Sequence, residues 1–170
     1  MWFKNLYIYR FTKPFDTTSD ALEEQLSTAA FTPCGANDVY QLGWSSPLGK
    51  LSESLVHVAD KYSMLCLTKQ EKILPSSVVN EQVNERAELI EETQHRKVSR
   101  KEKTELKEQV TIELMPKAFA RTNKYYAYLC PSKGYMVINT ASAKTADEVT
   151  SYLRKTIGSL PVRPVEVKQS

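Results

Sequence analysis

The sequence SSVVNEQVNERAELIEETQHRKVSRKEKTELKEQVTIELMP, residues 76–116, decides the fold of this chain. It follows Pro75 and contains no glycine, and no proline before its last residue. Apolar residues recur in it at steps of three or four, first at Val79, Val83, Ala87 and Ile90 and then at Leu106, Val110 and Leu114. Because an α-helix brings residues at this spacing onto one face, the pattern predicts two consecutive helices.

The segment between these two predicted helices, residues 95–103, is short and basic. Ser99 and Glu102 have the spacing of a capping box, in which each side chain satisfies an amide at the start of a helix. We therefore expect the second helix to begin near Ser99, and the two helices to fold back on each other as an antiparallel hairpin. The cations of this turn are Arg96, Lys97, Arg100, Lys101 and Lys103. They face the single acid Glu102, so the far end of the hairpin is expected to be strongly positive.

The composition is that of an ordinary globular protein. The 170 residues carry a net charge of +3, and 25% of them are charged. Because this net charge is mild, any anion binding must depend on where the charges gather. The longest apolar stretches fall well below the roughly 20 residues that a membrane helix needs, and the N-terminus lacks the features of a signal peptide. We therefore expect a cytoplasmic protein with no membrane contact.

The rest of the chain predicts strands and two shorter helices. Strand patterns occur at residues 2–11, 55–59, 62–68, 123–130 and 135–139, whereas residues 31–44 are expected to be irregular. Ser19 or Asp20 is expected to cap one short helix, and a capping box of Thr145 and Glu148 the other. Strands joined by short turns favour an antiparallel sheet with helices on one face. The predicted class is α+β, with a sheet body at residues 1–75 and 117–164, the helical hairpin of residues 76–116 as a projecting arm, and a tail at residues 165–170.

Residues suited to catalysis are few. The chain has two histidines, and its three cysteines, Cys34, Cys66 and Cys130, form no CxxC pair. Such cysteines are expected to be free and buried, and a zinc site is not expected from so few ligands. Neither a GxSxG nor an HExxH motif is present. We therefore expect a binding protein rather than an enzyme, with no catalytic residue, cofactor or metal.

The basic turn is suited to duplex DNA. A duplex presents one phosphate charge per about 1.7 Å, so clustered cations at a helix junction can meet several phosphates and release their counterions. Lys117, Arg121 and Lys124 flank the base of the arm and could extend the positive track. Two alternatives remain open: a hairpin that is merely soluble, or an arm used for dimerisation. The first gains support from Glu102, Glu105 and Glu108, which could pair at helical spacing with Lys101, Lys103 and Lys107.

Phe119 comes directly after the point where the chain leaves the hairpin. An aromatic residue there either fills the local core, which is the default interpretation, or anchors a partner subunit. The same two interpretations apply to three tyrosines on one predicted strand, Tyr125, Tyr126 and Tyr128.

Several segments together resemble one family. They are WFKNL (residues 2–6), AFTPCG (30–35), GW (43–44), EKILP (71–75), PKAF (116–119), ASAK (141–144), LRK (153–155) and GSLP (158–161). Their order is similar to that in the RdgC family of bacterial recombination-associated proteins, and the resemblance covers essentially the whole chain.

The resemblance implies a non-enzymatic, largely sequence-independent binder of double-stranded DNA in the bacterial nucleoid. It also implies a homodimeric ring with a positively lined hole, which restrains the RecA recombinase by occupying DNA. Carried over to this sequence, it makes Arg96, Lys97, Arg100 and Lys101 DNA-facing candidates and places Phe119 at a contact between subunits.

The chain departs from the family in one respect. Family members continue for a further domain of similar size, whereas this chain stops at Ser170, as expected of either a truncated chain or an unusually short member. The alternative function is therefore a dimerisation or interaction module, with DNA contact mainly in the missing C-terminal half.

Overall fold

The computed structural model describes residues 6–165. The strands are β1 (Tyr7–Phe11), β2 (Tyr40–Ser45), β3 (Val56–Ala59), β4 (Tyr62–Ile73), β5 (Phe119–Cys130), β6 (Tyr135–Ile138) and β7 (Val162–Pro164). The α-helices are α1 (Ser19–Ser27), α2 (Ser76–Gln94), α3 (Arg100–Leu114) and α4 (Ala143–Ile157). The described residues also include three 3₁₀ helices: η1 (Gly49–Leu51), η2 (Met115–Lys117) and η3 (Pro131–Lys133).

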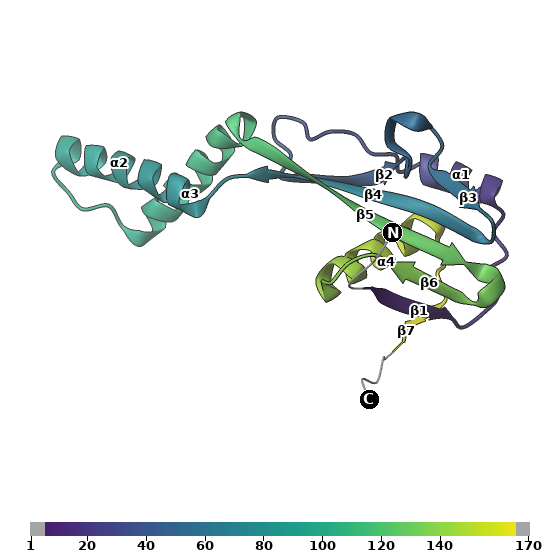
Figure 1. Ribbon diagram of the computed structural model, residues 1–170. Coiled ribbons are helices and arrows are strands. Elements are labelled where there is room, and N and C mark those ends of the chain that lie inside the picture. The colour runs from purple at the N-terminus through teal and green to yellow at the C-terminus, as the bar shows by residue number, and fades with distance from the viewer. Residues whose placement is uncertain (1–5, 166–170) are drawn as a thin grey trace. The chain divides into compact units, whose positions relative to one another are not determined.

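The strands form one sheet in the order β2-β4-β5-β6-β1-β7, with β3 paired to β4 (Figure 1). The pairs β1–β6, β1–β7, β3–β4 and β5–β6 are all antiparallel. The predicted α+β class with an antiparallel sheet is therefore confirmed.

By their internal contacts, the described residues divide into two compact units. Residues 6–32, 42–69 and 123–165 form the first, which we call the sheet unit. Residues 33–41 and 70–122 form the second, the helical unit, which contains α2 and α3. Strands β4 and β5 each contribute residues to both units, since β4 ends in the helical unit and β5 begins there.

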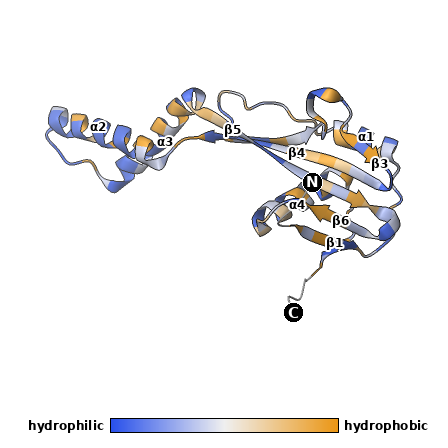
Figure 2. Cartoon of the chain, in the orientation of Figure 1, coloured by the Kyte–Doolittle hydropathy of each residue, from blue (hydrophilic) through white to orange (hydrophobic). Residues whose placement is uncertain are grey.

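The core of the sheet unit lies between one face of the sheet and the helices α1 and α4. Its buried side chains include Leu22 of α1, Val149 and Leu153 of α4, and Leu129 and Met136 of the sheet. Residues alternate between the two faces along each strand. Figure 2 shows hydrophobic residues at intervals along the strands, as this alternation requires. Hydrophilic residues dominate α2 (Figure 2).

Both short helices were predicted, but their caps differ from the prediction. Thr18 caps α1, because its hydroxyl accepts a hydrogen bond from the Ala21 amide. Ser142 caps α4, and its hydroxyl accepts from the amide of Thr145. The predicted Thr145–Glu148 box is therefore wrong: α4 begins at Ala143, which places Thr145 inside the first turn.

Strand β2 lies in the segment that was predicted to be irregular. Gly43 interrupts its apolar pattern, so the sequence pattern does not reveal the strand. The structure needs glycine there, because a Cβ would collide with the backbone of Phe31. The neighbouring Trp44 is fully buried, and its indole N–H donates to Thr156 Oγ1 at 3.0 Å.

The other strands extend or add to the predicted ones. Strand β4 runs on to Ile73 and β5 starts already at Phe119. Strand β7 was not predicted, because a three-residue strand that ends in Pro164 carries almost no pattern. It pairs with β1, and the Val165 amide donates to the Ile8 carbonyl at 2.8 Å. The prediction for residues 2–5 lies outside the described residues.

Helices α2 and α3 pack against each other within the helical unit. Val79, Val83 and Val110 form their buried cluster, and the partly buried residues packed against it are Leu74, Leu106 and Leu114. The apolar spacing that predicted the two helices therefore also marks the residues that join them. The predicted projection of this pair as an arm stays a prediction.

All three cysteines are free, as expected. Cys66 and Cys130 are buried, whereas Cys34 is only half-buried, so the expectation of burial is wrong for Cys34. Among residues 6–165, no helix is both long and apolar enough to cross a bilayer.

Candidate functional site

The loop between α2 and α3, residues 95–99, is held by hydrogen bonds to side chains of both helices. His95 adopts a left-handed conformation with φ 49°, which ends α2. Val98 is buried, and its amide donates to Glu91 Oε1 at 3.1 Å. Ser99 and Glu102 form the capping box that their spacing predicted, which fixes the start of α3.

Arg96 is engaged within this loop. Its guanidinium donates two hydrogen bonds to the carboxylate of Glu102, from Nη1 at 2.8 Å and from Nη2 at 2.9 Å. Its Nε donates to Gln94 Oε1 at 2.8 Å. The Arg96 hydrogen bonds, followed by the backbone hydrogen bond from Ser99, lower the pKa of Glu102 from 4.5 to about 2. The positive charge of Arg96 is therefore largely offset inside the loop.

Three cations of α3 line a hollow of about 380 Å³ together with residues of α2. The cations are Arg100, Lys103 and Lys107, and they recur at steps of three and four along α3. Asn80 and Asn84 of α2 lie opposite as neutral polar residues. Among the described residues, no carboxylate lines this hollow, which we call the basic groove.

The predicted ion pairs that would neutralise α3 do not form. Glu102 pairs with Arg96 instead of Lys101. Among the described residues, Lys101, Lys103 and Lys107 form no ion pair, and all three are exposed. Lys97 is also exposed. The start of α3 adds the partial positive charge of a helix N-terminus to these cations.

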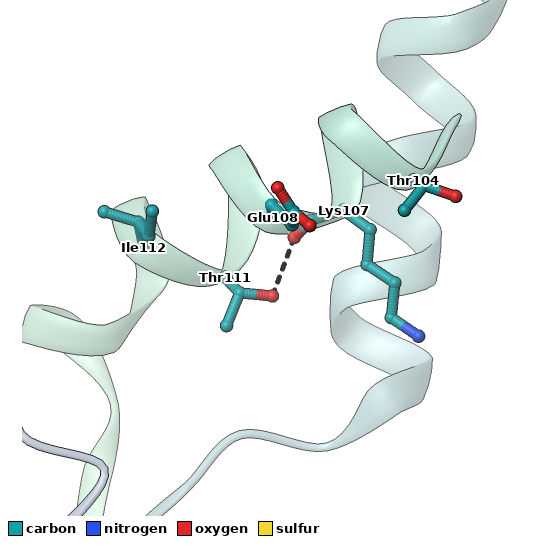
Figure 3. A pocket seen from close by; sticks show the side chains of 5 residues that line it. All are labelled: Thr104, Lys107, Glu108, Thr111 and Ile112. Atoms are coloured by element: carbon teal, nitrogen blue, oxygen red, sulfur yellow. Dashed lines mark hydrogen bonds between the residues drawn. The ribbon is translucent and has the colours of Figure 1, made fainter. Parts of the chain in front are cut away.

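Lys107 also borders a second, shallow hollow on α3 (Figure 3). Thr104 lies at one end of it and the exposed Ile112 at the other, with Thr111 between them. The Thr111 hydroxyl is turned back to donate to the Lys107 carbonyl at 2.7 Å. The Lys107 side chain extends away from Ile112 (Figure 3).

The three flanking cations of the sequence prediction are divided between the two units. Lys117 and Arg121 belong to the helical unit and Lys124 to the sheet unit. Arg121 is paired with Glu71 at 2.6 Å, whereas Lys117 and Lys124 are exposed. A single positive track through all three stays a prediction.

Phe119 is 84% exposed, so the default assignment of this residue to the core is wrong. It borders an apolar hollow of about 290 Å³. The hollow is lined by Ile73, Leu74, Pro75, Val78, Leu114, Lys117, Ala118 and Phe119, which we call the Phe119 patch. The local core is already closed by Leu74 and Leu114 against the valines of α2 and α3, which leaves Phe119 outside.

Comparison with known proteins decides the family. The family model described as "Putative exonuclease, RdgC" matches residues 1–170. The chain belongs to the RdgC family. Relatives named recombination-associated protein RdgC include those of Aeromonas hydrophila, 48% identical over 168 residues, and Psychromonas ingrahamii, 43% identical over 168 residues. The RdgC of Tolumonas auensis is 45% identical over 164 residues.

These alignments cover 96% to 99% of this chain but only 54% to 56% of the RdgC relatives. The chain thus spans about half the length of the curated relatives that it matches. Their name ties the RdgC family to recombination, whereas the description of the family model names an exonuclease.

Sequence reasoning missed Lys107, Asn80 and Asn84. The step from Arg100 through Lys103 to Lys107 could have grouped the three cations on one face of α3. No sequence signal says that Asn80 and Asn84 lie opposite that face, because their placement depends on how the two helices cross.

Proposed function

We propose that this chain binds double-stranded DNA without sequence preference, through the basic groove and the exposed Lys97 and Lys101 beside it. The observation that carries the proposal is a groove whose described lining residues include three cations and no carboxylate. Such a surface suits phosphate oxygens, which carry no sequence information. The recombination-associated name of the relatives is consistent with a DNA ligand.

Arg96 takes a different part in this proposal from the one that the resemblance implied. Because Glu102 and Gln94 use its donors, Arg96 shapes the loop that presents Lys97 and Arg100. The phosphate contacts fall to the cations that lack an internal partner.

A salt titration of duplex binding tests the proposal. The logarithm of the binding constant should fall linearly with the logarithm of salt concentration, by about 0.9 for each phosphate contact. The variant Arg100→Ala/Lys103→Ala/Lys107→Ala should bind more weakly, and its slope should be flatter by up to about 0.9 for each phosphate that it no longer neutralises.

The matched control removes the same amount of charge elsewhere. Lys50, Lys144 and Lys155 are exposed residues of the sheet unit, and their triple alanine variant should keep the parental slope. If both triple variants bind alike, the groove is not the site and only the net charge matters.

The proposal includes a biological role for this DNA binding. A nucleoid protein that occupies duplex DNA restrains RecA-mediated recombination by denying the recombinase its substrate. It needs no catalysis, and the part of the basic groove that the structure describes offers lysine, arginine, asparagine, threonine and valine but no carboxylate or imidazole. A labelled duplex incubated with the protein and magnesium should therefore keep its length.

A second function, homodimerisation, rests on the Phe119 patch. An exposed phenylalanine beside Ile73 and Val78, which are 44% and 42% exposed, is the kind of apolar anchor that protein interfaces bury. In a homodimeric ring, this patch would contact its counterpart on the second subunit. Sedimentation of the parent and of Phe119→Ala measures this self-association. The parent should self-associate and the variant should be monomeric. If the parent is monomeric as well, the patch does not mediate dimerisation of this chain.

A further inference from the structure

The sheet unit has a second face that its helices do not cover. Met136, Ile138, Leu129 and Ala127 point into the core with α1 and α4. Their strand neighbours therefore point the other way, and the register places Tyr128 opposite Val137, and Tyr135 opposite Cys130, on that second face.

Tyrosines gather on this second face. Tyr62, Tyr128 and Tyr135 line one hollow of about 280 Å³ with Leu6 and Val137, and each tyrosine is partly exposed. Tyr126 lies on the same face of β5, two residues from Tyr128. The hydroxyls of Tyr62 and Tyr135 are 2.9 Å apart and their rings meet edge to face, which holds both rings in place. We call these four residues the tyrosine face.

Within the sheet unit, the strands that carry this face contain no acidic residue. Every described Asp and Glu of that unit lies in a helix, loop or turn, while the second face of the strands has Arg10, Lys124 and Arg163. Burial raises the pKa of the Cys66 thiol on the same face, and the Thr68 hydroxyl and the nearby Lys124 oppose that shift only in part. On the described strands of the sheet unit, the ionic charge of this face is therefore entirely positive.

Arg10 and Arg163 stand directly opposite each other on β1 and β7. Like charges in this position repel, and a sheet gains nothing from the arrangement by itself. Neither arginine forms an ion pair with any of the described residues, and the two line a common hollow with Thr12, Pro164 and Val165. An anion bound between them would relieve the repulsion.

We propose that the tyrosine face binds single-stranded nucleic acid, whose unpaired bases stack on the tyrosine rings while its phosphates lie against Arg10, Arg163 and Lys124. Rings on adjacent strands of an antiparallel sheet, bordered by cations, are the arrangement by which such sheets hold two or three bases. A duplex cannot use it, because its bases are already stacked and paired.

A second copy of this chain fits this face less well. A two-fold interface would place the same surface against itself. The cations of one copy would then face the cations of the other, and the strands offer no acidic residue to pair with them. Charge complementarity therefore favours a polyanion with aromatic groups.

The test is fluorescence anisotropy of the 170-residue chain with two labelled probes, oligo(dT) and a strand of equal length whose sugars carry no bases. The parent should bind oligo(dT) distinctly more tightly, because only oligo(dT) can stack. Tyr62→Leu/Tyr128→Leu should weaken oligo(dT) binding by about 5- to 150-fold for each base that can no longer stack. It should leave binding of the abasic strand as it was.

Two controls keep the test decisive. Tyr62→Phe/Tyr128→Phe keeps the rings and should retain oligo(dT) binding, and Tyr40→Leu removes an exposed tyrosine of the helical unit and should change nothing. Equal binding of the two probes by the parent, which requires no variant to fold, would overturn the proposal. So would a leucine variant that alters sedimentation but not oligo(dT) affinity, since that result assigns the face to a second copy.

The outcome is separable from that of the duplex proposal. The triple alanine variant of the basic groove should lose duplex affinity and keep its preference for oligo(dT) over the abasic strand. The leucine variant of the tyrosine face should show the reverse pattern.

Discussion

Glu102 shows how one side chain can serve two purposes in a short loop. It accepts the Ser99 amide within the capping box and both terminal nitrogens of Arg96. All of these partners favour the ionised carboxylate, which is why its pKa falls to about 2. The loop conformation that presents Lys97 and Arg100 therefore depends on the ionisation of Glu102.

The pH dependence of this loop follows from the direction of that shift. Because the folded pKa is lowered from 4.5, the stabilisation by Glu102 is fully present above pH 4.5 and is lost as the pH falls through about 2. An NMR titration should show the Glu102 carboxyl changing near pH 2, together with the Arg96 Nε–H signal. Arg96→Ala should move that titration toward 4.5, and a parental midpoint near 4.5 would contradict the ion pair.

The backbone around Gly43 leaves no room for a side chain. A Cβ at this position would overlap the backbone of Phe31, next to the parallel bridge between Ala30 and Trp44. Since backbone cannot move aside as a side chain can, Gly43→Ala should destabilise the sheet unit by about 3 kcal/mol or more in denaturant unfolding. Gly35→Ala is the control, because its Cβ would meet only the Asp38 side chain, at 3.2 Å. A similar loss in both variants would refute this explanation.

At the scale of elements, α3 depends on its cap. Ser99 Oγ accepts the Glu102 amide at 3.2 Å. Ser99→Ala should therefore cost about 1 kcal/mol of stability and Ser99→Gly only a few tenths, measured by denaturant unfolding followed through helical circular dichroism. If the alanine and glycine variants were equally stable, the Ser99 cap would not determine the stability of α3.

Packing between α2 and α3 should matter more than the cap. Val110 is fully buried against Val79 and Val83. Val110→Ala removes two methyl groups and leaves a cavity, with an expected cost of about 2 kcal/mol in the same measurement. Ile112→Ala is the matched control, because Ile112 is 67% exposed and its truncation should cost little. Equal losses in the two variants would show that burial in this cluster is not what stabilises the pair.

The elements differ in how far the sequence predicts them, and the reason is physical. The periodic residues of α2 and α3 lie within single segments, so local sequence suffices for both helices and for the Ser99 cap. Strands β2 and β7 gain their stability from partners far along the chain, which a short pattern broken by Gly43 or ended by Pro164 does not reveal. In the candidate site, the sequence supplied the cations but not the pairing of Arg96 or the place of Lys107, which depend on side-chain geometry.

At the scale of the whole molecule, the two units have separate hydrophobic cores. The core around Leu129 and Leu153 draws only on residues of the sheet unit, and the core around Val83 and Val110 only on those of the helical unit. Neither unit takes its buried apolar residues from the other. The sheet unit is therefore expected to fold without α2 and α3.

A hairpin replacement tests this expectation and both binding proposals together. Gln70 and Thr122 are joined by a hydrogen bond of 3.1 Å between their side chains, so β4 and β5 are close enough there for a two-residue turn. Replacing residues 71–121 with Asn-Gly should leave a chain that unfolds cooperatively and retains its preference for oligo(dT) over an abasic strand. Because the basic groove, Lys97 and Lys101 are all removed, duplex binding should fall at least to the level of the triple alanine variant. A replacement chain that keeps the parental salt dependence for duplex DNA would place the duplex site in the sheet unit, and one that fails to fold would show that the two cores are not independent.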